Sequence, residues 1–103
     1  PLEPKWHKLE PKASPGGRFA GRMVYHSRLK IWLLCGDGKS GRDKEPLRDT
    51  WVYAPHLSTW LKIQTQKTPP TGNGAAIWYD AAGEQVVYFA DYQTWRLRLK
   101  PAL

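Results

Sequence analysis

The feature that most constrains the fold is an internal repeat: the chain of 103 residues overlays itself when it is shifted by 54 positions. RMVYHSRLKIWLLCGD at 22–37 then meets AIWYDAAGEQVVYFAD at 76–91. The second copy then lacks ten residues, and with this gap DTWVY at 49–53 meets QTWRL at 93–97. A repeat of this length is one supersecondary unit that buries its hydrophobic face against a neighbour. The sequence therefore predicts two stacked units of roughly fifty residues.

Each unit has the pattern of short β-strands. Two aliphatic and aromatic runs are separated by three or four turn residues, the spacing of a β-hairpin, and we expect Gly83 to take a positive φ there. A third run, at 49–54 and 94–99, alternates in character. A fourth, at 5–10 and 59–64, alternates large apolar residues with Lys. Pro and Gly recur too often for long helices, so the fold class is all-β, with four-stranded antiparallel sheets.

Aromatic residues gather in RDTWVYAPHLSTW at 48–60. Trp51 and Tyr53 are two positions apart and face one side of a strand, and Trp60 starts the next strand after a turn. An aromatic ligand platform is one interpretation. Because Trp95 repeats the position of Trp51 in the second unit, we favour packing, with these rings filling the space between neighbouring sheets.

The first unit carries three motifs in order: PGGRFAGRMVY, IWLLCG and DTWVYAPHLSTW. This pattern resembles Kelch repeats, which have a Pro-x-x-Arg stretch, a diglycine at the end of the second strand, and an Asp-Thr-Trp-x-Tyr segment followed by a later Trp. The matching positions are Pro15, Arg18, Tyr25, Gly36, Asp49, Trp51, Tyr53 and Trp60, and in the second unit Pro69, Tyr79 and Trp95. The diglycine is replaced by Cys35-Gly36 and Phe89-Ala90, and Gly72 stands where the first unit has its arginine.

The resemblance implies a β-propeller built from four-stranded antiparallel blades. Residues 11–65 would be a first Kelch-like blade, 66–103 a second, shortened and incomplete blade, and 1–10 an outer strand that completes another blade. Propellers contain about four to eight blades, so two units leave apolar faces and sheet edges uncovered. Either chains assemble head to tail into a ring, which the strand offset favours, or the chain is a fragment of a longer propeller.

The formal net charge of +7 favours acidic partners, including nucleic acid. Loops that share one face of such a blade carry basic side chains that could bind an acidic protein segment or another anion. The alternative is a set of solvated loop residues partly neutralised by Asp43 and Glu45. The candidate partner-binding residues are Lys12, Arg18, Lys39, Arg42, Lys44 and Arg48.

The sequence offers no catalytic constellation. Cys35 is the single cysteine, lies in an apolar run and is expected to be a buried, unreactive thiol. The three histidines, His7, His26 and His56, are far apart and predicted to lie at the surface, so no metal or cofactor is expected. GDGKSG at 36–41 lacks the spacing of a phosphate-binding loop. No apolar run has the roughly 18 residues that a membrane span needs.

From these observations we expect a non-enzymatic protein-binding or scaffold module, a repeat protein that associates as a homo-oligomer or belongs to a longer propeller. Two alternatives remain open at this point. The first is association with nucleic acid or other anions through the positive charge, which would weaken steeply with added salt. The second is a fragment of a propeller enzyme, which would require a metal-ligand set absent from the sequence patterns above.

Overall fold

The computed structural model describes residues 2, 4–16, 18–19, 21–39, 47–70 and 75–100. The side chains of 18–19, 37–39 and Leu47 are outside that description. The described chain is β structure with one 3-10 turn, η1, and no α-helix. Its elements are β1 (Arg18–Phe19), β2 (Arg22–His26), β3 (Ile31–Lys39), β4 (Leu47–Ala54), η1 (Pro55–Leu57), β5 (Thr59–Ile63), β6 (Ala76–Asp80), β7 (Gln85–Ala90) and β8 (Gln93–Leu97).

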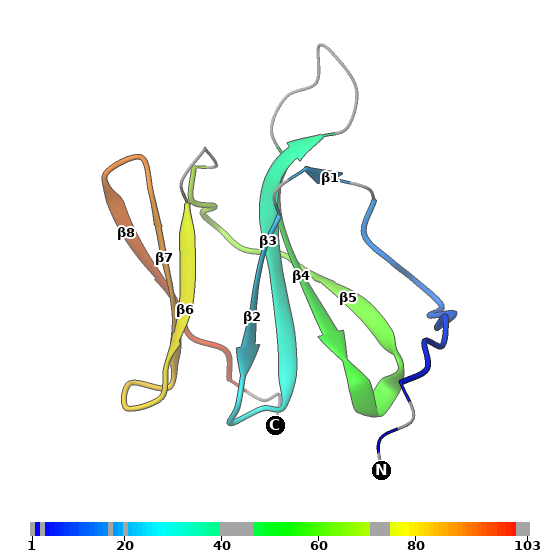
Figure 1. The fold of residues 1–103 in the computed structure, drawn as a ribbon. Coiled ribbons are helices and arrows are strands. Elements are labelled where there is room, and N and C mark those ends of the chain that lie inside the picture. Colours follow the sequence, from blue (N-terminus) through cyan, green and yellow to red (C-terminus); the bar gives the residue numbers. More distant parts are fainter. Residues whose placement is uncertain are drawn as a thin grey trace.

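The strands form two antiparallel sheets, as the alternating runs predicted. The first is a four-stranded meander in the order β2-β3-β4-β5, and the short β1 pairs with the far end of β3. The second has three strands in the order β6-β7-β8. Figure 1 shows the two sheets standing beside each other, with β2 and β6 as neighbouring strands. The all-β prediction is confirmed.

Strand register follows the offset found in the sequence. Leu34 lies opposite Trp51 in the first sheet, and Tyr88, which is 54 positions later, lies opposite Trp95 in the second. In both sheets the indole N–H also donates to the side chain two residues upstream. Trp51 donates to Asp49 (2.8 Å) and Trp95 to Gln93 (3.0 Å). The two tryptophans therefore have equivalent surroundings in their own strands.

The hairpin turns that precede β3 and β7 repeat the same hydrogen bond. The N–H of Leu29 donates to Nδ1 of His26 (3.2 Å), and the N–H of Gly83 donates to Oδ1 of Asp80 (3.2 Å). Side-chain acceptors of this kind replace backbone partners in tight turns. The positive φ falls on the last residue of each turn, at Lys30 (57°) and Glu84 (49°).

The prediction that Gly83 has a positive φ is therefore wrong, because Glu84 takes that conformation. The space around Gly83 is tight instead. A Cβ at this position would lie 2.7 Å from Oδ2 of Asp80 and 3.0 Å from Nε2 of Gln85. Those two atoms are themselves joined by a hydrogen bond of 2.9 Å, so a larger residue would disturb the carboxylate that holds the turn.

β3 is longer than its sequence pattern predicted. The expected strand ended near Cys35, but pairing continues to Lys39 across a register shift between Cys35 and Asp37. Gly36 lies at this irregularity with a φ of 30°. A glycine adopts that conformation without the steric penalty of a side chain, so the strand bends there without ending.

The core lies between the two sheets. We call the face of each sheet that packs on the other its inner face, and the opposite face its outer face. The buried centre consists of Ile31, Leu33, Val52, Ala54 and Val86. Half-buried residues from both sheets surround it: Val24, Leu29, Ile63, Ile77, Tyr79, Leu97 and Leu99. Burying a side chain of this size contributes about 1.5–3 kcal/mol, so contacts between the two sheets carry much of the stability.

The predicted strand at residues 5–10 is in neither sheet of the single chain. Its neighbouring segment approaches β5, where the N–H of Ala13 donates to Oγ1 of Thr59 (3.3 Å). Because the prediction assigns residues 1–10 to another blade, a single chain leaves it untested.

Candidate functional site

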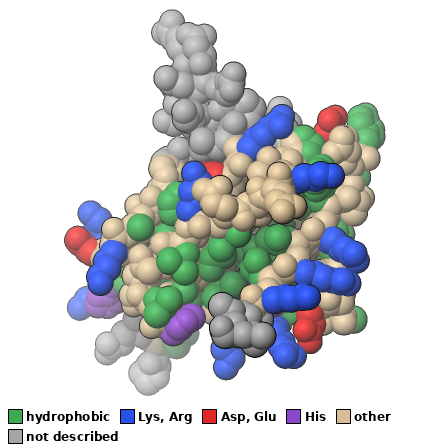
Figure 2. Space-filling model, turned by 180° about the vertical axis from the view of Figure 1, so that it is seen from behind, with side chains coloured by type: hydrophobic (Ala, Val, Ile, Leu, Met, Phe, Trp, Pro, Cys, Tyr) green, Lys and Arg blue, Asp and Glu red, His purple; other side chains and the backbone are tan. Residues whose placement is uncertain are grey.

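The predicted basic site lies mostly outside the described residues. Lys12 and Arg48 are described, and both are exposed. Arg42 and Lys44 are outside the described ranges, and the backbones of Arg18 and Lys39, but not their side chains, are described. The idea of one basic surface therefore remains a prediction. Figure 2 shows a different pattern on one side of the molecule, with hydrophobic side chains gathered at the centre and Lys and Arg around them.

The outer face of the first sheet carries a row of four aromatic rings, one from each strand. Tyr25 lies opposite Trp32, Trp32 opposite Tyr53, and Tyr53 opposite Trp60. The ring centroids of Tyr25 and Trp32 are 4.8 Å apart, and those of Tyr53 and Trp60 are 5.2 Å apart. Both separations lie in the range of favourable aromatic pairs. We call this set the aromatic row.

The aromatic row is only partly covered: Tyr53 and Trp60 are half-buried, whereas the other two rings are exposed. Tyr25 and Trp32 are each 39% exposed, and Met23, in the adjacent row, is exposed as well. The expectation that Trp51, Tyr53 and Trp60 fill the space between neighbouring sheets is thus not met within this chain. These residues of β4 and β5 face away from the second sheet, whereas Trp95 lines the space between the sheets.

In the second sheet, the row equivalent to the aromatic row is buried against the first sheet. Tyr79 lies opposite Val86, and Val86 opposite Leu97, at the positions that correspond to Tyr25, Trp32 and Tyr53. These three side chains belong to the core against the first sheet. A face that is exposed in the first unit is therefore an interface in the second. The opposite, outer face of the second sheet exposes Trp78 and Phe89.

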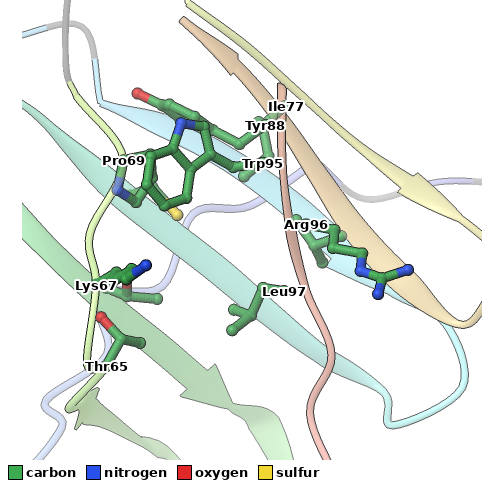
Figure 3. A pocket seen from close by; sticks show the side chains of 11 residues that line it. Thr65, Lys67, Pro69, Ile77, Tyr88, Trp95, Arg96 and Leu97 are labelled. Atoms are coloured by element: carbon green, nitrogen blue, oxygen red, sulfur yellow. The ribbon is translucent and has the colours of Figure 1, made fainter. Parts of the chain in front are cut away.

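A small cavity of about 90 Å³ opens between the inner faces of the two sheets. In Figure 3 the Trp95 ring lies close to Pro69, and Thr65 and Lys67 follow the connecting segment along one side. Cys35 also lines this cavity and is half-buried, so the predicted burial of its thiol is met only in part. The remaining lining residues are Thr50, Ile77, Val86, Tyr88, Arg96 and Leu97. The mainly apolar walls and small volume suit one apolar group.

His26 is buried, so its predicted position at the surface is wrong. It is 1% exposed, and its ring lies 4.5 Å from that of Tyr79 in the second sheet. Nδ1 accepts the N–H of Leu29, and Nε2 has no hydrogen-bond partner. Burial is the main cause that lowers the pKa of His26 below 6.5, with Glu84 raising the pKa and Arg28 lowering it. No local signal could have shown this, because Tyr79 comes from the other unit.

Across the described ranges, no group of three or more His, Cys, Asp and Glu side chains could hold a metal ion. The same part of the chain contains no helix with the length and hydropathy to cross a membrane. Comparison with family models, curated proteins and solved structures finds no match to this chain.

Proposed function

We propose that this chain is a non-enzymatic protein-binding or scaffold module in which Kelch-like propeller blades stack face to face. In this proposal the aromatic row receives another β-sheet. The observation that carries it is the difference between equivalent faces: Tyr25 and Trp32 are exposed, whereas Tyr79 and Val86 are covered by a neighbouring sheet.

The packing within the chain supports a head-to-tail arrangement. The outer face of the first sheet corresponds by register to the inner face of the second, and the outer face of the second corresponds to the inner face of the first. A stack of this kind leaves one unsatisfied face at each end. The two free outer faces are equivalent to the two inner faces that pack together inside the chain. Another repeat of the same kind is therefore the partner that fits. Contacts that do not pair identical surfaces generate rings when the rotation closes.

Mass measurement in solution tests the proposal. Light scattering across a concentration series should give multiples of the 11.8 kDa chain. Trp32→Glu should weaken this association by roughly tenfold or more, since a charge at a central aromatic position removes a main contact. Leu57→Glu is the matched control, because Leu57 is exposed in η1 and lies outside the aromatic row. A chain that stays monomeric at every concentration, or equal effects of the two variants, contradicts the proposal.

A further inference from the structure

The last strand of the second sheet, β8, lies at the edge of its sheet, whereas the equivalent strand β4 lies inside the first sheet. β4 pairs with β3 on one side and β5 on the other. β8, the equivalent of β4, pairs with β7 alone among the described residues. An unpaired edge presents a row of backbone N–H and C=O groups that can bind another strand. Among the described residues, the second sheet therefore has one strand fewer than the β2-β3-β4-β5 meander.

The inner face of the first sheet shows the same shortage. Val24, Leu33, Val52 and Leu61 lie in one row across its four strands. Leu33 is 0% and Val52 4% exposed, because the second sheet covers them, but Leu61 on β5 is 46% exposed. The second sheet ends at β8 and does not cover Leu61. A fourth strand next to β8 would cover this end of the row as well.

A segment similar in sequence to β5 lies outside both sheets in the same chain. WHKLE at 6–10 matches WLKIQ at 60–64, most of which forms β5. Residues 4–10 are in no strand, and Trp6 is 100% exposed. Full exposure of a tryptophan leaves a large apolar area in water, which a neighbouring strand would remove.

The segment cannot fill the gap in its own chain while it keeps its observed position. Ala13 is bonded to Thr59 next to β5, and Figure 1 places this N-terminal stretch on the opposite side of the molecule from β8. A second copy of this chain can supply that strand instead.

Resting on the proposed function, we propose that residues 6–10 of one copy add to β8 of a second copy as an antiparallel fourth strand. In this arrangement β8 takes the place of β4 and residues 6–10 take the place of β5. The register of β4 and β5 then pairs Trp6 with Leu97, His7 with Arg96, Lys8 with Trp95, and Leu9 with Thr94. Trp6 then completes the row formed by Tyr79, Val86 and Leu97, as Trp60 completes the aromatic row.

Engineered cysteines test this register in the full chain, with Cys35→Ser removing the native thiol. His7→Cys in one copy and Arg96→Cys in another should form a disulfide on mild oxidation, since residues directly opposite across strands have Cβ atoms about 4.5–5.5 Å apart. His7→Cys with Thr94→Cys is the matched control, two residues out of register on the same face. His7, Arg96 and Thr94 are all exposed, so the substitutions spare the core.

We expect at least fivefold more covalent heterodimer from the first pair than from the second when the two single variants are mixed. Equal or absent cross-linking in a chain that still associates overturns strand donation and leaves the proposed function standing. A chain that remains monomeric by light scattering overturns both. Trp6→Ala should also reduce association by at least fivefold, whereas Leu2→Ala, at an equally exposed position, should not.

Discussion

The two sheets share strand order, register and turn hydrogen bonds, yet they bury opposite faces. In the first sheet, Leu33 and Val52 are covered, whereas Tyr25 and Trp32 of the aromatic row are exposed. In the second, Tyr79 and Val86 occupy positions of the aromatic row and are covered. The difference arises because each sheet has one neighbour, on opposite sides. A repeated sequence thus fixes what a strand pairs with, whereas the stacking order decides which face is buried.

Replacement of Leu33 should have the largest effect, because it removes a side chain at the centre of the shared core. Leu33→Ala is expected to lower the free energy of unfolding by about 2–5 kcal/mol. Leu34→Ala is the matched control, since Leu34 is the next residue and faces outward. Urea denaturation measures both. Similar losses at the two positions would show that the faces are not distinguished by burial in solution.

Protonation of His26 should have the next largest effect on the free energy of unfolding. Its pH dependence also distinguishes the two equivalent turns. Burial lowers the pKa of His26 below its unfolded value of 6.5, so the unfolded chain binds the proton more readily. Stability is then fully present above pH 6.5 and is lost as the pH falls toward the folded pKa, with a slope of at most about 1.4 kcal/mol per pH unit.

His26→Asn should flatten this dependence, because an amide oxygen can accept the Leu29 N–H without titrating between pH 7 and 5. Denaturation curves at several pH values in that window compare the two proteins. In the second turn, the hydrogen bond from Gln85 is the main cause that lowers the pKa of Asp80 below 3.8. Stability from that turn is lost only at more acidic pH. Parallel curves for wild type and His26→Asn would contradict the assignment to His26.

The strands and their register could be predicted from the sequence because both depend on local alternation and on the repeat offset. The Trp51 and Trp95 positions are the clearest example. The burial of His26 could not be predicted, because it depends on Tyr79, a residue of the other sheet. Alternation defines two faces for a strand, but it does not say which face meets a partner. The exposure of Tyr25 and Trp32 is therefore decided by the packing of the sheets alone.

Local backbone detail was predicted less well, for reasons visible at particular residues. The strand that contains Cys35 was predicted to end at Gly36, but β3 continues to pair with β4 beyond the bulge at this glycine. Gly83 looked like the residue with positive φ, because glycine is the usual choice there. The turn instead places Glu84 in that conformation and uses Gly83 to make room for the Asp80 carboxylate. The candidate basic site depended on loop residues, and the structure describes few of their side chains.

Lys30 offers a smaller test of the equivalence of the turns. Its φ of 57° is costly for a residue with a side chain. Lys30→Gly should therefore raise the free energy of unfolding by about 0.5–1 kcal/mol. Ser27→Gly, in the same turn at a residue without positive φ, should instead lower it slightly. Thermal denaturation of both variants measures the two signs, and a loss of stability in Lys30→Gly would contradict the turn geometry.

The smallest effect is expected at the ion pair that joins the two turns. Nη1 of Arg28 donates to Oε1 of Glu84 across 2.9 Å, with both side chains more than half exposed. Exposed pairs of this kind contribute about 0–1 kcal/mol and are screened by salt. Glu84→Gln keeps the backbone conformation and removes the charge, so it should cost less than 1 kcal/mol at low salt and nearly nothing in 1 M salt. A double-mutant cycle with Arg28→Gln isolates the pair. A coupling that persists in 1 M salt would mean that the turns are held together by more than this exposed contact, and that the junction of the sheets is more protected from solvent than the side-chain exposure indicates.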